Sequence, residues 1–149
     1  DADTVLLRPQ VFEVNGRIVF LHSDEHHQPY FNLYRQLFGS ETPTNLSFVS
    51  HQVILRQSRI RELRNEIRTR HGNEEWFRAI MNLVTSSPEF AMSEYEIYGQ
   101  WMLRNYPGEM AREYWFNIPC RPKNLKAVLA DADRLAREYR SVSFHSYLV

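Results

Sequence analysis

The sequence predicts a mixed α and β domain, and two features of the chain indicate it. Short apolar, β-prone runs lie near both ends, and the middle of the chain repeats apolar residues at helical spacing. The length of 149 residues suits one domain. We therefore expect a single α/β domain over residues 1–149, with a small mixed sheet and flanking helices.

Strands are expected first in the N-terminal part of the chain. Residues 5–7 are apolar and β-prone, and two further such runs, 11–14 and 17–21, flank Asn15-Gly16. Asn-Gly between two β-prone runs is the strongest short-range signal of a β-hairpin. Two more strands are expected, at residues 46–55 and 113–118.

Helices are expected wherever apolar residues recur at i, i+3 and i+4. They cover residues 30–38, 58–71, 74–84, 93–105 and 124–137. Gly39 and Gly72 are expected to end the helices at 30–38 and 58–71, and Ser58 and Ser93 are expected to cap the starts of the helices at 58–71 and 93–105. The tail at 142–149 is short and aromatic.

Charge and cysteine content narrow the classes of partner. Lys+Arg and Asp+Glu both number 18, so the chain lacks the net positive charge and electrostatic field expected of a nucleic-acid binder. No apolar run approaches the roughly 20 residues that a transmembrane helix needs. The single cysteine, Cys120, excludes an internal disulfide and is consistent with a reducing, cytoplasmic setting.

An Asp-Ala-Asp triplet opens the chain and is the first candidate metal site. In a turn, Asp1 and Asp3 could aim both carboxylates at one Mg²⁺ or Mn²⁺, which prefer oxygen ligands and often keep substrate phosphates. The same spacing recurs at 131–133 inside an expected helix, where positions i and i+2 point roughly 200° apart. That second pair is interpreted as a solvated helix face. For the first pair, a polar turn is the alternative.

The segment Ser93-Glu94-Tyr95-Glu96 is the second candidate. Ser-x-x-Glu before an apolar pattern is a capping box, in which Ser93 accepts from the backbone N–H of Glu96 and the Glu96 side chain reaches back. Glu94 then stays free in the first turn, where the helix dipole stabilises its ionised form. A carboxylate fixed at such a place can act as a general base toward a hydroxyl.

Other polar groups carry weaker signals. His145 and His51 are, by residue type and setting alone, interpreted as structural histidines. The loop at 22–27 has the composition of a metal site but matches no tight coordination motif, so a solvated loop is favoured. The arginines of 56–70 alternate with glutamates, which indicates a solvated helix with weak ion pairs rather than a phosphate or nucleic-acid patch.

Taken in order, four segments resemble glycosyltransferases of the GT-A fold, in particular an uncharacterised bacterial branch. They are Asp1-Ala2-Asp3-Thr4-Val5 with Arg8-Pro9, Phe48-Val49-Ser50-His51-Gln52-Val53-Ile54-Leu55, Ser93-Glu94-Tyr95-Glu96-Ile97-Tyr98-Gly99, and Phe144-His145-Ser146. The resemblance spans most of the chain. Its most specific parts are the Asp-x-Asp and the Ser-Glu-Tyr-Glu-x-Tyr-Gly segments.

The resemblance implies a GT-A-type fold and metal-dependent transfer of a sugar. The donor would be a nucleotide-diphosphate sugar, and the acceptor a hydroxyl of a glycan or similar molecule. Asp1 and Asp3 would hold Mn²⁺ or Mg²⁺ against the diphosphate, and His145 matches the C-terminal histidine that completes the metal shell in several GT-A families.

The resemblance also assigns the acceptor and donor contacts. Glu94 or Glu96 would contact or deprotonate the acceptor. His51 lies in the strand that commonly borders the donor sugar, and Gln52 and Tyr95 are the other substrate-binding candidates.

One departure from the GT-A pattern changes the expected domain. In that fold the Asp-x-Asp motif follows a βαβ half that binds the nucleotide base, and nothing precedes Asp1, so we expect an N-terminally truncated domain. Two other classes are open. A non-catalytic carbohydrate- or protein-binding module would leave Asp1, Asp3, Glu94 and His145 apart. A metal-dependent hydrolase would use Asp1 and Asp3 and would bring the loop 22–27 onto Asp3.

Overall fold

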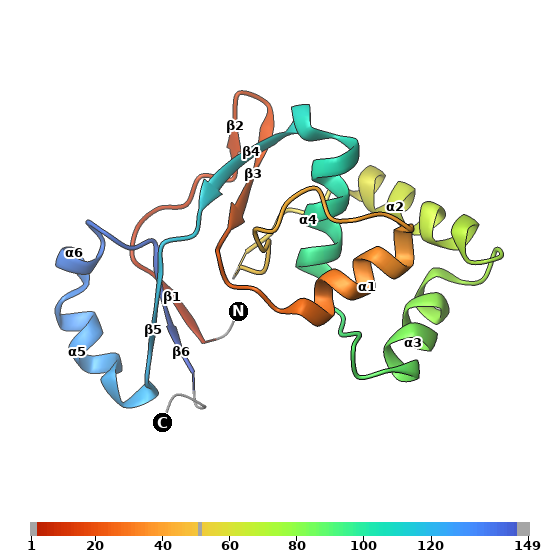
Figure 1. Cartoon of the computed structure of the whole chain (residues 1–149). Helices are drawn as coiled ribbons and strands as arrows, with labels where there is room; N and C mark the ends of the chain where they lie inside the picture. Colours follow the sequence, from red (N-terminus) through yellow and green to blue (C-terminus); the bar gives the residue numbers. More distant parts are fainter. Residues whose placement is uncertain (1–2, 51, 146–149) are drawn as a thin grey trace.

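The computed structural model describes residues 3–50 and 52–145 (Figure 1). The described part of the chain contains six α-helices and two three-stranded sheets, so the predicted mixed α and β class is confirmed. One sheet lies beside the two short C-terminal helices, and the other lies beside the four longer helices (Figure 1). Every helix within these residues is too short or too polar to cross a membrane.

The first sheet joins the two ends of the described chain. β1 (Thr4–Leu6) pairs antiparallel with β6 (Ser141–Phe144), and β6 pairs parallel with β5 (Asn117–Cys120). Val142 on the central strand is fully buried. The pairing is non-local, because residues near the beginning of the sequence lie directly against residues near its end (Figure 1).

The second sheet confirms the predicted hairpin. β2 (Glu13–Val14) and β3 (Arg17–His22) pair antiparallel around Asn15 and Gly16, whose φ angles are 52° and 76°. Positive φ at both central residues is what a type I′ hairpin turn requires, and Asn-Gly adopts it readily. β4 (Met110–Tyr114) then adds in parallel to β3 and completes the order β2-β3-β4.

The strand expected at 113–118 is instead two strands in different sheets. β4 ends at Tyr114, and β5 begins at Asn117. Between them the backbone turns, because Phe116 N–H donates to Tyr114 O at 3.2 Å and Asn117 N–H donates to Trp115 O at 2.9 Å. The chain thereby passes from one sheet to the other (Figure 1).

Four longer helices pack against one another, and Ile18 and Phe20 of β3 join their buried core. The four helices are α1 (Gln28–Phe38), α2 (Gln57–Arg70), α3 (Trp76–Ser86) and α4 (Glu94–Asn105). The fully buried side chains at the centre of this core include Ile18, Leu33, Tyr34, Leu37, Phe38, Ile67, Tyr98 and Met102. Gly39 ends α1 in the left-handed conformation, at φ 62°, as its sequence position predicts.

Two expectations about helix boundaries are wrong. α2 begins at Gln57 with Arg56 at its N-cap, so Ser58 lies inside the first turn and caps nothing. The single helix expected over 124–137 is instead divided into α5 (Leu125–Ala130) and α6 (Ala132–Leu135), preceded by a 3₁₀ turn at Pro122–Asn124. The chain bends at Asp131, where ψ is 16°.

The prediction of a strand at residues 46–55 is also wrong. Its described residues form a loop with one β-bridge, between Ser47 and Ser23. Phe48 is 2% exposed and fills the helical core, which explains the apolar pattern without a strand. Backbone groups of this loop are bonded partly to α4, because Phe48 N–H donates to the Glu96 side chain and Leu46 O accepts from the Gln100 side chain, so these groups need no neighbouring strand.

Candidate functional site

Asp3 and His145 meet at one end of the first sheet. Asp3 precedes β1 and His145 follows β6, and antiparallel pairing brings these two positions to the same end. Phe144 N–H donates to Asp3 O at 2.8 Å, which fixes the register there. The Asp3 Oδ2 atom lies 3.1 Å from His145 Nδ1. The expectation that their ligand atoms would approach within a metal's reach is confirmed.

The Asp3 side chain also faces open space. It is 42% exposed, and together with Val5, Leu125 and Phe144 it lines a surface depression of about 220 Å³. Pro122 of the 3₁₀ turn before α5 closes another part of the wall. A ligand much larger than a water molecule could therefore reach the Asp3 carboxylate.

The chemistry of this pair fits a hard divalent cation that shares its shell with phosphate. A carboxylate oxygen and an imidazole nitrogen are both ligands of Mn²⁺, and Mg²⁺ favours oxygen ligands and substrate phosphates. Asp1, the third predicted ligand, lies outside the described residues. Among residues 3–50 and 52–145, no group of three or more His, Cys, Asp and Glu side chains is placed to hold a metal.

The polar loop at 22–27 makes local contacts rather than joining Asp3. Asp24 accepts a 2.7 Å hydrogen bond from the Tyr114 hydroxyl. His26 stacks on Phe31 with ring centroids 4.3 Å apart. Burial lowers the pKa of His22, and the positive charge of Arg112 lowers it further. These contacts hold the loop against β4 and α1, and they favour the structural interpretation of its histidines.

The start of α4 is capped as its sequence predicts. Ser93 Oγ accepts a 3.3 Å hydrogen bond from Glu96 N–H. The Glu96 side chain turns inward instead of reaching back to Ser93, and no part of the residue is exposed. The first half of the capping box is therefore present, while the carboxylate that would form the second half bonds elsewhere.

The Glu96 carboxylate binds the loop that precedes α2. Its Oε2 atom accepts from Ser47 Oγ at 2.6 Å and from Phe48 N–H at 3.1 Å, and its Oε1 atom accepts from Gln100 Nε2 at 2.7 Å. Burial raises the pKa of Glu96, whereas these hydrogen bonds act to lower it. The geometry gives Glu96 a structural role, because a buried carboxylate with three donors has no open path to a substrate.

Two other residues of α4, Tyr98 and Gln100, bind the same loop. Gln100 Nε2 donates to Leu46 O at 3.0 Å and to Thr44 O at 3.2 Å. The Tyr98 hydroxyl accepts from Arg56 N–H at 3.1 Å, where the loop enters α2. Sequence reasoning missed this function of the segment at 93–100, since the loop partners lie far away in the sequence.

The remaining predicted site residues lie on different elements. Glu94 is exposed in the first turn of α4, and Tyr95 beside it is half-buried. Gln52 is half-buried in the loop, and its carbonyl oxygen accepts from Ser50 Oγ at 2.8 Å. His51 lies outside the described residues. The structure thus brings Asp3 and His145 into contact and leaves Glu94 as the accessible carboxylate of α4.

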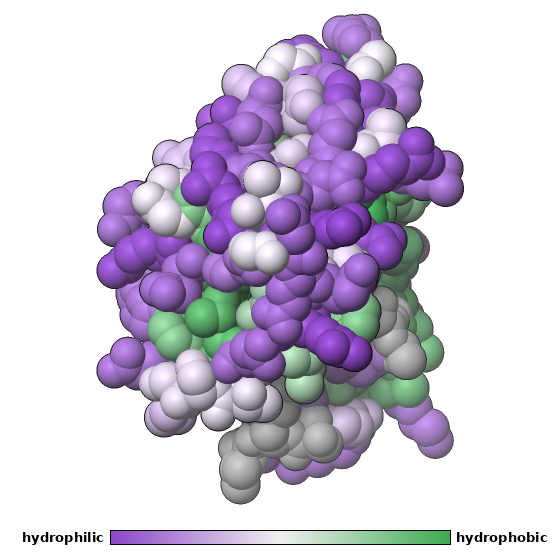
Figure 2. Space-filling view, turned by 90° about the vertical axis from the view of Figure 1, so that its right-hand side faces the viewer, coloured by the Kyte–Doolittle hydropathy of each residue, from purple (hydrophilic) through white to green (hydrophobic). Residues whose placement is uncertain are grey.

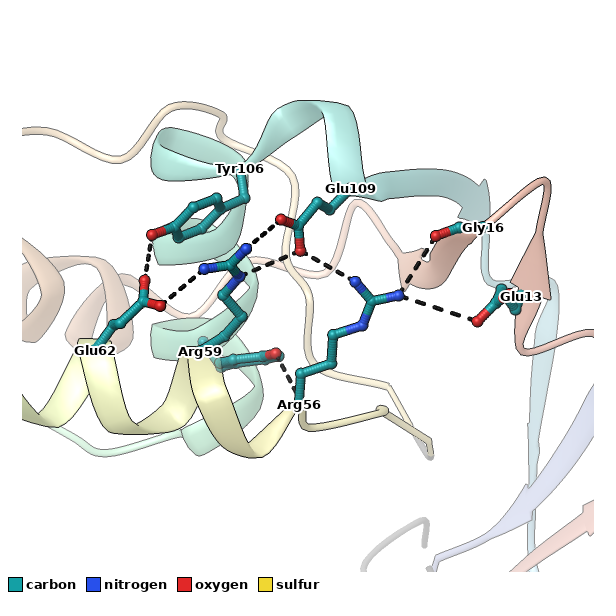
Figure 3. A network of polar contacts seen from close by, with 8 residues as sticks. Glu13, Gly16, Arg56, Arg59, Glu62, Tyr106 and Glu109 are labelled. Atoms are coloured by element: carbon teal, nitrogen blue, oxygen red, sulfur yellow. Dashed lines mark hydrogen bonds and ion pairs between the residues drawn. The ribbon is translucent and has the colours of Figure 1, made fainter.

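An ion-pair network occupies the basic start of α2 (Figure 3). Arg59 lies between Glu62 and Glu109 and bonds both, while Arg56 Nη1 lies 3.1 Å from Glu109 Oε2. Tyr106 donates its hydroxyl to Glu62. The hydrogen bond from Arg59 lowers the pKa of Glu109. Both arginines are engaged by carboxylates, so this cluster fastens α2 to the turn after α4 and is not a phosphate site.

The fold and site together define a mixed α and β domain with a candidate metal-ligand pair at a sheet end. Comparison with protein-family models, with curated proteins and with solved structures found no match to the chain. The arrangement of its own residues is therefore the basis for a functional proposal.

Proposed function

We propose that the protein takes part in metal-dependent transfer of a sugar from a nucleotide-diphosphate donor to a hydroxyl acceptor. The observation that carries this proposal is the 3.1 Å approach of Asp3 Oδ2 to His145 Nδ1 beside an open depression of about 220 Å³. A carboxylate from one end of the chain and an imidazole from the other are the ligand types that the resemblance to GT-A enzymes assigns to the metal.

Asp3 and His145, with Asp1, would hold Mn²⁺ or Mg²⁺ in this site. A bound divalent cation supplies positive charge against the negative charge that develops on a leaving diphosphate. The protein's own contribution is to fix the two ligands. Pairing of β1 with β6 sets the distance between their backbones, and the His145 N–H donates to Cys120 O at 3.0 Å, which orients the residue further.

Glu94 is the residue we assign as base toward the acceptor. It is exposed, and it lies in the first turn of α4, where an acceptor molecule could reach its carboxylate. The acceptor oxygen would form a bond to the anomeric carbon as the bond from that carbon to the diphosphate oxygen breaks. The acceptor proton passes to the Glu94 carboxylate, and the nucleotide diphosphate leaves with the bonding electron pair.

A transfer assay on the intact protein with Mn²⁺ and a panel of nucleotide-diphosphate sugars tests the proposal. Asp3→Ala should abolish transfer, and Glu94→Gln should lower turnover on the order of 10²–10⁴-fold. Asp133→Ala is the matched control, because Asp133 belongs to the second Asp-Ala-Asp triplet and is exposed on α6. Full activity of Asp3→Ala would exclude this site as the source of transfer.

A further inference from the structure

A second cavity lies between α2, α3 and α4. Its volume is about 150 Å³, and its walls include Leu55, Trp76, Met92 and Ile97. Figure 2 shows apolar atoms exposed between hydrophilic side chains on the face of the molecule that carries α2 and α3. The cavity is thus an apolar hollow that opens to solvent, lined by side chains of the helical core and its margin.

The size of this cavity matches a single ring. An engineered apolar protein cavity of about 150 Å³ is known to bind benzene, which fills it without polar contacts. The Trp76 side chain in the wall provides an aromatic surface for offset or edge contact with such a ring. A six-membered aromatic group is therefore the occupant that the volume and the wall chemistry favour.

Two opposite charges complete the lining. Arg64 and Glu94 are the charged residues among those that line the cavity, and both are exposed. Within the described part of the chain, neither forms an ion pair. The Arg64 guanidinium lies 4.8 Å from the centre of the Trp76 ring, which holds it beside the aromatic wall.

These charges give an occupant a direction. Arg64 can bind a carboxylate through charge-assisted hydrogen bonds, and Glu94 would repel the same group. A hydroxyl donates readily to a carboxylate, so it is favoured near Glu94. Ring, carboxylate and hydroxyl thus each have a complementary partner: the cavity, Arg64 and Glu94 respectively.

We propose that this cavity binds a hydroxylated aromatic carboxylate, with its ring inside, its carboxylate at Arg64 and its hydroxyl at Glu94. Its role as the acceptor of sugar transfer rests on the proposed function, because Glu94 is the base assigned there. The binding itself needs neither metal nor donor. The two statements can therefore be tested separately.

Ligand-observed NMR titration of the metal-free protein tests the site with 4-hydroxybenzoate as the probe. We expect saturable binding, with benzoate and phenol each binding more weakly because each lacks one polar group. Arg64→Gln should weaken the affinity for 4-hydroxybenzoate about tenfold or more, since a charge-assisted hydrogen bond is lost. This variant should then bind 4-hydroxybenzoate and phenol with similar affinity. The proposal would be overturned if the folded wild type did not bind 4-hydroxybenzoate, or if Arg64→Gln still bound it more tightly than phenol by the same factor as the wild type.

A blocking variant separates the cavity from non-specific surface binding. Met92 lies in the segment before α4 and is 45% exposed, so Met92→Trp can fill the opening without disturbing a helix. It should weaken binding of all three probes at least about tenfold. Met81→Trp is the control, because Met81 is 55% exposed on α3 and does not line the cavity. If Met92→Trp and Met81→Trp bind the probes with equal affinity, the cavity is not the binding site.

The same probe distinguishes failure of the cavity from failure of the transfer proposal. Both proposals are supported if 4-hydroxybenzoate binds as expected, the intact protein transfers sugar to it, and Met92→Trp loses this transfer. If 4-hydroxybenzoate binds but the protein transfers no sugar to it, the cavity is a binding site but not the acceptor site. Transfer to other acceptors without binding of the probe removes the cavity proposal alone.

Discussion

Gly99 on α4 lies directly against the side chain of Phe48: a Cβ atom added at Gly99 would stand 2.3 Å from Phe48 Cγ. Real Cβ atoms do not approach ring carbons so closely, so helix and loop can touch here only because residue 99 has no side chain. Glu96 and Gln100 bond the same loop from one turn before and one position after. This close packing places the segment that carries Gln52.

Gly99→Ala should therefore destabilise the protein although alanine favours helices. Overpacking a well-filled core typically costs about 1–3 kcal/mol, which exceeds the roughly 1 kcal/mol gained by replacing glycine inside a helix. Urea unfolding would measure the change in the free energy of unfolding. Gly108→Ala is the control, since nothing lies within 4 Å of a Cβ added there. A Gly99→Ala variant as stable as the wild type would contradict the packing.

The Glu96 carboxylate predicts a specific pH dependence of stability. Burial raises its pKa in the folded state above the usual value of 4.5. The folded state then holds the proton more tightly than the unfolded state, so stability falls as pH rises from the unfolded pKa through the folded pKa. Glu96→Gln cannot ionise, and the stability of wild type relative to this variant should decrease over that window.

Chemical denaturation at a series of pH values would measure the difference. Glu25→Gln, which removes one carboxylate from an exposed loop, is the matched control against which the effect of Glu96→Gln is compared. A constant difference between wild type and Glu96→Gln at all pH values would show that the buried carboxylate does not titrate differently on folding.

Glu109 should show the opposite sign. The hydrogen bond from Arg59 lowers its folded pKa, so its contribution is present above the unfolded pKa and is lost as pH falls through the folded pKa. Glu109→Gln should reduce stability at neutral pH and weaken the loss of stability on acidification. Thermal unfolding at neutral and acidic pH would show both effects. A variant with the acid sensitivity of the wild type would refute this role.

Ser93 should contribute to stability as an N-cap. Ser93→Ala removes the acceptor of the Glu96 N–H bond and should lower the free energy of unfolding by about 1 kcal/mol. Ser58→Ala is the comparison, because Ser58 lies exposed inside the first turn of α2 and caps nothing. Equal effects of the two substitutions in urea titrations would argue against a cap at Ser93.

Local signals in the sequence predicted the parts of the fold that depend on neighbouring residues. Asn15-Gly16 specifies its own turn, and Ser93 specifies a helix start, because the groups that satisfy each signal lie within three residues. The loop at 46–50 was wrongly predicted as a strand, since a buried apolar run is compatible with either state. Its true partners, Glu96 and Gly99, lie about fifty residues away, beyond the reach of pattern reasoning.

The candidate site, too, was predicted from the sequence only in part. The approach of Asp3 to His145 depends on pairing between the first and last strands, and only the resemblance to GT-A enzymes pointed to it. Exposed Glu94 and buried Glu96 could not be separated by sequence, because the capping box says nothing about where the Glu96 carboxylate turns. The second cavity had no sequence signal, since its lining comes from three helices and the segments before α2 and α4, whose packing the sequence did not reveal.

The measurement that tests the central claim most directly is Mn²⁺ binding to the intact protein, followed by the loss of the electron paramagnetic resonance signal of free Mn²⁺. We expect saturable binding that Asp3→Ala and His145→Ala each weaken at least about tenfold, because each removes a direct ligand. Asp133→Ala should bind as the wild type does. Mn²⁺ affinity that is unchanged in both Asp3→Ala and His145→Ala would contradict the account.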